Sequence, residues 1–353
     1  MDNFNFQYYI VFTFLALFSI FVSLKLDIKG KNSRLGLWYI VPFLVFIIYL
    51  FGNRTKEIGA DSSTYAFIFQ NTALQDFGIE FMNAFLFQTL GKLTYNYQVL
   101  FIVYSVLFVS IYIYALKRFS INFETSFPLV VFAAICIFTF KNMGINIMRQ
   151  GVAISFFLLG LSFFLKKSKL AYVFFVISVG FHTTSAILLL LVFMQKWLKN
   201  VNINVLYGLY CFSILLSFFA IGIKNLASFV DLSIFDEKRT EGYLNTSYNV
   251  YETGFKLNFV IFNSLFLIIF NSIRRFFVND DYEFILRLFI TTSIVFFFMF
   301  EIPFSDRWGL FSWILIPILI SPLFSVDFKY KLKTVTTLFL ILIFVVFEYI
   351  MWN

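Results

Sequence analysis

Two residues that could do chemistry stand inside long apolar stretches of the sequence. Arg149 opens one apolar run, and His182, the only histidine in the chain, lies in the middle of the next. A charged side chain at the centre of a membrane helix costs about 2.5–3.5 kcal/mol, so such residues usually face a cavity or a partner. We therefore expect the chemistry of the protein to centre on residues 142–191.

An arginine and a histidine together suit the transfer of a group from a lipid-linked diphosphate. A guanidinium presents a rigid fork of donors to phosphate oxygens, and fixed cations stabilise the charge that develops on the leaving group. A histidine with a pKa near neutrality can accept the proton of an attacking hydroxyl. The sequence has no Walker loop, HExxH, GxSxG or dinucleotide glycine pattern. We expect no ATP-driven transport, no cofactor and no metal ion.

The composition indicates a membrane protein built from helices. The chain is 61% hydrophobic and 13% charged, whereas a soluble domain has about 25% charged residues. Its apolar runs of about 17–25 residues can cross a hydrocarbon core of about 30 Å, and the ~10-residue alternation of a membrane barrel is missing. Cys136 and Cys211 lie inside apolar runs without metal-binding spacing. We predict an all-α, polytopic integral membrane protein with 1–353 as a single membrane-embedded domain.

The distribution of charge predicts which loops face the cytoplasm. The net charge is +8, and most basic residues stand in short loops between apolar runs. This pattern is typical of the positive-inside rule, so we expect membrane lipid around the protein and no nucleic acid as a partner. Asp2 precedes the first apolar run and the first basic residue, Lys25, follows it, which predicts an outer N-terminus without a cleavable signal.

Two longer polar segments, about 52–96 and 224–254, then fall on the outer side. In the first segment apolar residues recur at helical spacing, which predicts an amphipathic helix that lies in the membrane interface or docks on the bundle. The residues of this apolar face are Phe77, Phe81, Phe85 and Leu86. Residues 127–140 are expected to form one short span, and residues 141–148 an outer loop.

The positive-inside rule also decides the path of residues 170–194. A single crossing would place every later basic loop outside, whereas entry and return on the cytoplasmic side keeps them all inside. Only about 12 residues are available for each leg, or ~18 Å of helix. We therefore predict a re-entrant or shortened hairpin that turns at 180–184, surrounded there by protein or a water-filled cavity. One long helix, with the change of side elsewhere, is the alternative. The total is about 10–12 transmembrane helices.

With this topology the polar residues near the spans converge on the outer face. Each has a structural alternative: an arginine can reach to lipid headgroups, an acid can pair with a neighbouring arginine or cap a helix, and the histidine can bond a carbonyl. Besides Arg149 and His182, the candidates are Asp61 and Tyr65 in the first outer segment, Gln150, Arg239 in the second outer segment, and Asp306 and Arg307 in the last outer turn.

Four segments carry a resemblance to a known family: GADSSTYAFIF, INIMRQGVAISFFLLG, GFHTTSAILLL and DRWGLFSWILIPIL. In this order they resemble the EpsG/Wzy-type family of polysaccharide polymerases, most specifically in Arg149–Gln150 at the start of a span and in Phe-His-Thr-Thr-Ser-Ala at 181–186. The resemblance implies a fold like that of the GT-C glycosyltransferases. It also implies that Arg149, His182 and Arg307 matter, without assigning their roles.

The leading hypothesis is a glycosyltransferase of the bacterial inner membrane with its active face outward. As the resemblance implies, it would join oligosaccharide repeat units linked to polyprenyl (undecaprenyl) diphosphate into an O-antigen, capsule or exopolysaccharide, with a chain-length regulator as a further partner. We expect His182 to act as the base, Arg149 and Arg307 to hold the diphosphate, and Asp61 to orient or bind the sugar. The expected binding residues are Arg149, Gln150, Arg307, Arg239, Tyr65 and Asp306. A ligase that moves finished chains, a flippase of lipid-linked sugar and a structural scaffold are the alternatives.

Overall fold

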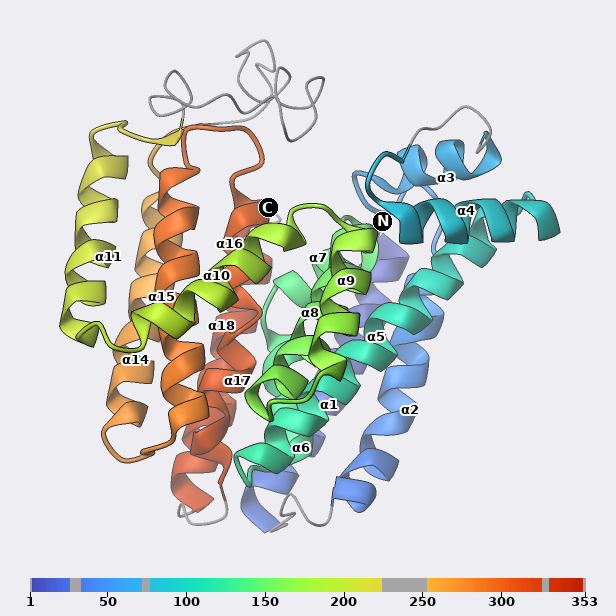
Figure 1. Ribbon diagram of the computed structural model, residues 1–353. Helices are drawn as coiled ribbons and strands as arrows, with labels where there is room; N and C mark the ends of the chain where they lie inside the picture. Colours follow the sequence, from blue (N-terminus) through green and yellow to red (C-terminus); the bar gives the residue numbers. More distant parts are fainter. Residues whose placement is uncertain (1, 26–32, 72–76, 224–252, 326–329, 352–353) are drawn as a thin grey trace. The chain divides into compact units, whose positions relative to one another are not determined.

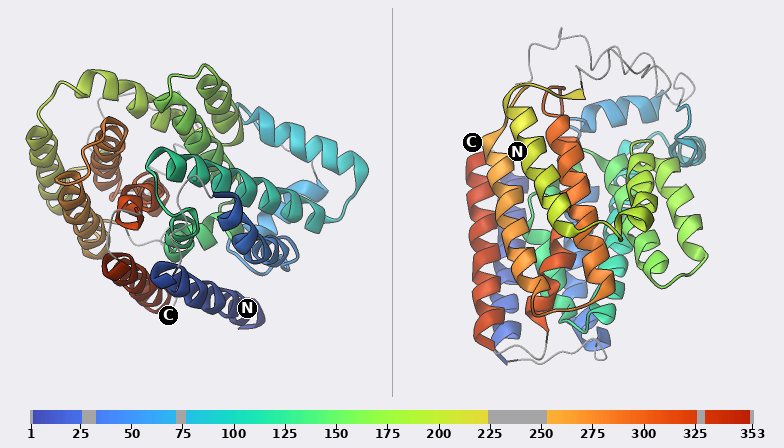
Figure 2. Two further views of the ribbon diagram at one scale, coloured as in Figure 1. Left: turned by 90° about the horizontal axis from the view of Figure 1, so that it is seen from below. Right: turned by 60° about the vertical axis from the view of Figure 1, so that its left-hand side comes forward.

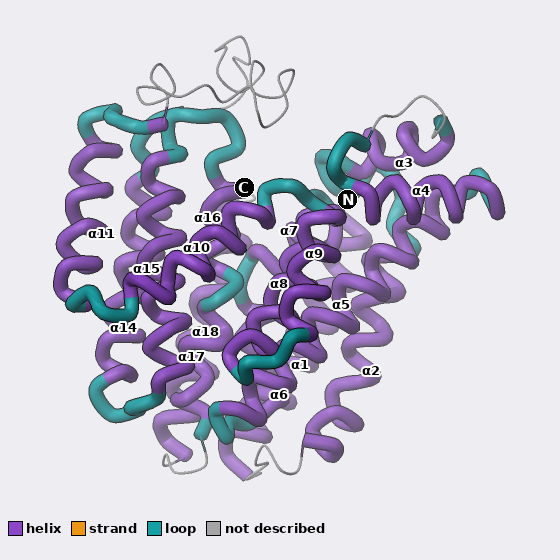
Figure 3. Tube along the Cα trace, viewed as in Figure 1, coloured by secondary structure: helices purple, strands orange, loops and turns teal. Residues whose placement is uncertain are grey.

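The computed structural model describes residues 2–25, 33–71, 77–223, 253–325 and 330–351. Within these residues all regular structure is helical (Figures 1 and 3), which confirms the predicted all-α class. The helices are α1 (Asp2–Lys25), α2 (Ser33–Gly52), α3 (Ser62–Gln70), α4 (Phe81–Leu93), α5 (Tyr97–Asn122), α6 (Phe127–Cys136), α7 (Thr139–Ile145), α8 (Met148–Leu165), α9 (Leu170–Phe181), α10 (Ser185–Leu198), α11 (Ile203–Phe218), α14 (Leu257–Arg274), α15 (Asp280–Phe298), α16 (Asp306–Trp313), α17 (Ile316–Ile320), the 3₁₀ helix η4 (Ser321–Phe324) and α18 (Tyr330–Met351).

The described helices include five that are long and apolar enough to cross a membrane, and one bent pair could make a sixth. The five are Asn3–Leu24, Tyr97–Asn122, Met148–Leu165, Leu257–Arg274 and Asp306–Phe324. Four further apolar helices are shorter, at 10–17 residues. The multi-pass membrane class is thus confirmed, while the total of 10–12 spans stays a prediction.

The chain forms two compact units. The first consists of Met1–Ile187 and Ile320–Asn353, and the second of Leu188–Leu319. The break between α9 and α10 lies in the first unit, at residues 182–184, within the predicted turn. Because most of α10 belongs to the second unit, the returning leg of the hairpin stays a prediction, and so does the single domain.

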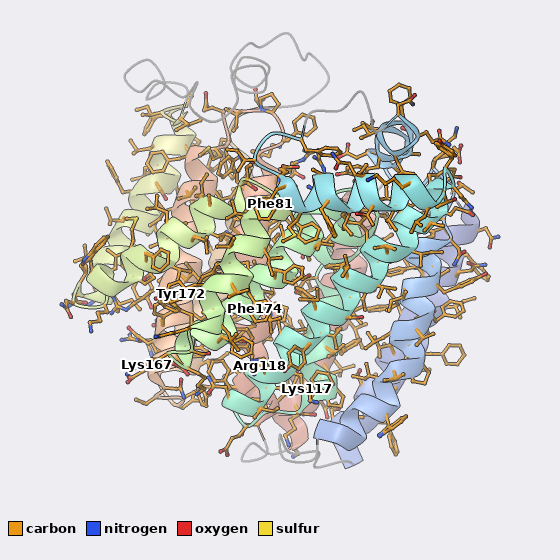
Figure 4. All side chains as sticks on the ribbon, turned by 45° about the vertical axis from the view of Figure 1, so that its right-hand side comes forward. Phe81, Lys117, Arg118, Lys167, Tyr172 and Phe174 are labelled. Atoms are coloured by element: carbon orange, nitrogen blue, oxygen red, sulfur yellow. The ribbon has the colours of Figure 1, made fainter. Side chains whose placement is uncertain are left out.

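In the first unit α3 and α4 lie at one end of the long helices α2 and α5 (Figure 1), and α4 runs across that end. α1 packs beside α18, so the two chain termini lie at this same end (Figure 2). Figure 4 shows Phe81 of α4 at this end and Lys117, Arg118 and Lys167 toward the opposite one. The separation of the polar segment 52–96 from these basic loops is what the predicted topology requires.

The amphipathic helix predicted in the first outer segment is present as α4. Its buried residues are Asn83 and Phe87, which face the bundle. Phe81 and Phe85, which we placed on the apolar face of this helix, are 46% and 62% exposed. α4 therefore docks through one face and presents apolar side chains on the other, an arrangement that suits a helix at a membrane interface.

The span expected at 127–140 is instead broken, because Ile137 between α6 and α7 has an extended backbone. The two helices meet at 74°. All ten residues of α6 are buried, and so are six of the seven in α7. Residues 141–145, expected in an outer loop, are thus part of a buried helix. Protein surrounds the break, as non-helical backbone at membrane depth requires.

The bend brings a lysine of α7 to a glutamate of α18. Lys141 Nζ lies 2.8 Å from Glu348 Oε2, and the two side chains are 4% and 6% exposed. The Tyr9 hydroxyl of α1 donates to the same carboxylate oxygen at 2.7 Å. This buried ion pair ties three helices together, and its membrane location makes either charge costly without the other.

Removing one partner of this pair is expected to destabilise the fold. Lys141→Met or Glu348→Gln alone should lower the free energy of unfolding by about 3–5 kcal/mol, because each leaves the other group buried without its partner. The double variant should recover most of that loss. Thermal unfolding of the purified protein in detergent measures all three, and a double variant as unstable as the sum of the single variants would contradict the pairing.

The second unit is held by a polar network around Asn263 of α14. The Asn263 side-chain amide donates to the hydroxyls of Ser293 and Ser312 at 3.0 and 3.2 Å, and its oxygen accepts from Trp313 Nε1 at 2.6 Å. These bonds join α14 to α15 and α16. A buried amide with all of these partners fixes the register of the three helices.

Candidate functional site

One buried carboxylate, that of Glu80, binds both of the residues with which the sequence analysis began. Glu80 Oε2 lies 2.6 Å from Arg149 Nη1, and Glu80 Oε1 lies 2.9 Å from His182 Nδ1. The Glu80 side chain is 2% exposed, whereas those of Arg149 and His182 are 19% and 14% exposed. The Arg149 guanidinium and the His182 imidazole are therefore the more accessible groups of the cluster, and the buried Glu80 carboxylate holds both of them in place.

The start of α8 places Arg149. Arg149 is the second residue of this 18-residue helix, where the helix dipole favours anions and disfavours a cation. Glu80 supplies the compensating negative charge from the start of α4. Arg149 Nε is buried and has no hydrogen-bond acceptor among the described residues. A helix N-terminus that also carries a partly exposed arginine side chain is suited to bind a phosphate group.

The end of α9 places His182. The helix stops because His182 adopts an extended backbone at its C-cap, and its N–H still donates to Ser178 O at 3.0 Å. Asn83 of α4 donates to the Phe181 carbonyl and to Glu80 Oε2, while the Tyr104 hydroxyl donates to Asn83 Oδ1. These bonds lock the junction of α4 and α9, so the position of the imidazole is set by packing and not by a flexible loop.

The contact between Glu80 and His182 determines what the imidazole can do. A neutral imidazole carries one proton, and a carboxylate opposite Nδ1 holds that proton on Nδ1. Nε2 is then the proton acceptor. In other catalytic histidines that a carboxylate binds at Nδ1–H, Nε2 likewise accepts the proton.

Arg149 is also held from the side of α3. Its guanidinium carbon lies 5.4 Å from the centre of the Tyr65 ring, a cation–π contact. Tyr65 itself is buried, at 6% exposure. Residues of the consecutive helices α3 and α4, distant in sequence from α8, thus hold the Arg149 guanidinium.

A second arginine, Arg54, lies buried between α2 and the junction of α7 and α8. Its Nη2 donates to Ile145 O at 3.0 Å and lies 2.9 Å from Met148 Sδ. Its guanidinium also stacks over the Phe101 ring at 4.1 Å. Burial lowers the pKa of Arg54 to about 9, so the side chain remains a cation at neutral pH and adds positive charge beside the start of α8.

Gly151 allows α8 to approach α7. A Cβ at this position would lie 2.6 Å from the Met143 carbonyl oxygen and 3.0 Å from its Cβ. A backbone atom cannot yield as a flexible side chain can, so a larger residue must push the start of α8 away from α7.

Gly151→Val is therefore expected to lower thermal stability and to displace Arg149, two residues earlier. Polymer formation should fall more than the amount of folded protein does, because small misplacements of a binding group cost large factors in rate. Gly208→Ala is the control, since nothing lies within 4 Å of a Cβ there. Wild-type stability of Gly151→Val would show that the helices do not pack as described.

The other predicted site residues are placed as follows. Asp61 holds the N-cap position of α3, but its side chain makes no capping hydrogen bond there, and it stands one turn before Tyr65. Gln150 is buried in α8. Asp306 and Arg307 begin α16 in the second unit, where the Arg307 guanidinium lies 4.6 Å from the Phe304 ring centre. Their convergence with Arg149 stays a prediction, and Arg239 lies outside the described residues.

Sequence reasoning missed Glu80, Asn83 and Arg54. A signal for Glu80 was present, because it lies within the predicted amphipathic segment, between Phe77 and Phe81 of the apolar face. Two cationic or ionisable residues in apolar runs also require an anionic partner. In the described residues no group of three or more histidine, cysteine, aspartate or glutamate side chains is arranged to hold a metal ion.

Comparison with known proteins decides the family. The model of the EpsG family matches residues 36–353, which is the whole chain after its first 35 residues. The chain belongs to the EpsG family. No curated protein and no solved structure matches it. Membership in the EpsG family confirms the resemblance and gives the protein a broad role of the membrane polysaccharide-polymerase type. Arg149, His182 and Glu80 all lie within the range that the EpsG family model covers.

Proposed function

We propose that this EpsG-family protein is a glycosyltransferase that joins oligosaccharide repeat units carried on polyprenyl diphosphate, at the outer face of the bacterial inner membrane. The observation that carries the proposal is the Glu80 carboxylate, which holds a phosphate-binding type of residue on one oxygen and a base on the other. Family membership supports the polymerase class. The separation of the site from the basic loops supports the outer face.

In the proposed step a hydroxyl oxygen of the acceptor sugar attacks the anomeric carbon of the donor unit. The bond from that carbon to the diphosphate oxygen breaks, and polyprenyl diphosphate leaves with the electron pair. The hydroxyl proton passes to His182 Nε2, and direct displacement inverts the anomeric centre. Arg149 binds the diphosphate and stabilises its growing charge. Glu80 keeps the imidazole in the tautomer that can accept a proton.

The turn that carries His182 also holds two buried hydroxyls without hydrogen-bond partners among the described residues. They are Thr184 Oγ1 and Ser185 Oγ, which follow the histidine. Buried hydroxyls without partners cost free energy.

A deletion strain tests the proposed function. Loss of a polymerase should leave single repeat units on the carrier and no ladder of longer surface polysaccharide on a gel. Complementation with the wild-type gene should restore the ladder. Long chains that remain on the carrier would indicate a ligase instead, and units trapped on the cytoplasmic face would indicate a flippase.

A further inference from the structure

A pocket opens beside the Glu80 cluster, in the part of the first unit where the α2–α3 connection meets the end of α7. Its volume is about 510 Å³, within the range of about 300–1,000 Å³ that is usual for ligand sites. Its lining residues are Lys56, Glu57, Gly59, Ala60, Ser63, Ile145 and Asn146. None of these residues takes part in the proposed transfer step.

The lining favours a saccharide over a diphosphate. It offers one cationic and one anionic side chain, a hydroxyl, an amide and the apolar surface of Ile145. A hydrogen bond from the Thr55 side chain lowers the pKa of Glu57, which therefore stays ionised at neutral pH. Because Glu57 would repel a phosphate group and offset Lys56, the pocket has no net attraction for polyanions. Sugars present many hydroxyls and an apolar ring face, which match this mixture of groups.

The walls of the pocket are fixed before any ligand arrives. Ala60 N donates to Asn146 Oδ1 at 2.8 Å, and Asn146 Nδ2 donates to Asn142 Oδ1 at 2.7 Å. Gly59 has a φ of +99°, and a Cβ there would lie 2.8 Å from Ile145 O. The Ser62 hydroxyl donates to the same carbonyl at 3.0 Å. A preformed wall lowers the conformational cost of binding.

The pocket shares two elements with the Glu80 cluster. Asn146 stands three residues before Arg149, so their Cα atoms are at most about 11 Å apart. On the other wall, Ser63 of α3 lines the pocket, while Tyr65, two residues further along α3 and on a different face of this helix, contacts the Arg149 guanidinium. The pocket therefore lies in the same part of the first unit as the start of α8, which carries Arg149.

We infer that this pocket binds the oligosaccharide part of a repeat unit and thereby holds a sugar chain in register with Arg149 and His182. The inference rests on the proposed function and deepens it by assigning a sugar subsite. Ser63 and Ala60 are exposed, so larger side chains at these positions fill the pocket without disturbing the core.

The test uses the full-length protein in lipid nanodiscs and, as the probe, the water-soluble oligosaccharide released by mild acid from the lipid-linked single units of the host strain. Calorimetric titration should show binding to the wild type. Ser63→Trp should weaken binding at least tenfold, because the indole occupies the pocket. Thr64→Trp is the matched control, since Thr64 is the next residue of α3, is also exposed and does not line the pocket. It should bind within twofold of the wild type.

Two further measurements separate this inference from the proposed function. Arg149→Ala should lose polymer formation yet bind the oligosaccharide within twofold, and inorganic pyrophosphate should not displace it. Absent binding by the wild type, equal binding by Ser63→Trp, or displacement by pyrophosphate would overturn the sugar subsite even if Arg149→Ala is inactive. Polymer formation by Arg149→Ala would instead overturn the proposed site, whatever the pocket binds.

Discussion

Glu80→Gln should abolish polymer formation although it changes only one oxygen to a nitrogen. The amide oxygen of the introduced glutamine can still accept from Arg149, but its NH₂ group then faces His182 Nδ1 and donates to it. The imidazole proton moves to Nε2, which can no longer accept a proton from an acceptor hydroxyl. Replacing the carboxylate by an amide in a carboxylate–histidine pair lowers turnover on the order of 10⁴-fold.

The measurement is polymer length on a gel, with the mass of lipid-linked material as a second readout. Single units should accumulate in cells that express Glu80→Gln, at a protein level that immunoblotting can compare with the wild type. Asp280→Asn, which removes an exposed carboxylate at the start of α15, is the control and should make normal polymer. Normal chains from Glu80→Gln would remove this carboxylate from the mechanism.

Arg149→Ala should likewise leave single repeat units, because the diphosphate loses its charged ligand at the start of α8. Removal of one preorganised donor costs about 10²–10³ in rate, and Arg149 offers several. Arg149→Lys should not restore the activity. An ammonium group can pair with Glu80 but cannot also present a planar fork to phosphate and to the Tyr65 ring.

Arg118→Ala supplies the matched control for Arg149. Arg118 Nε donates to Ser162 Oγ at 2.8 Å and its guanidinium lies 3.6 Å from the Phe163 ring centre. It thus makes a hydrogen bond and a cation–π contact as Arg149 does, near the other end of α8. Chain extension in this variant should continue. An equal loss of polymer from both variants would mean that the effect comes from packing and not from phosphate binding.

The sequence analysis located Arg149 and His182 because a polar residue in a run of hydrocarbon length is conspicuous against its neighbours. It missed Glu80 because an acidic residue before an amphipathic helix resembles an ordinary surface residue. Glu80 is 69 residues from Arg149 and 102 from His182 in the sequence. Only the tertiary fold, which packs α4 against α9 and brings Glu80 to the start of α8, joins the three residues, and periodicity does not encode such long-range contacts.

The all-α membrane class followed from composition and from the length of the apolar runs. The break at Ile137 could not be predicted, because neither proline nor glycine marks it in the sequence. Lys141 looked like a loop residue for the same reason that Glu80 did, since its partner Glu348 stands near the other end of the chain. Sequence patterns therefore do not predict the buried ion pairs between helices that are distant in the sequence.

The central claim is that the Glu80 cluster performs chemistry and does not only stabilise the fold. The double variant Glu80→Gln, Arg149→Met tests it most directly, because it removes both charges of the pair and so avoids an unpaired buried charge. Thermal unfolding should show stability close to that of the wild type, while purified protein given lipid-linked repeat units should form no longer chains. Wild-type stability together with normal chain extension in the double variant would contradict this claim.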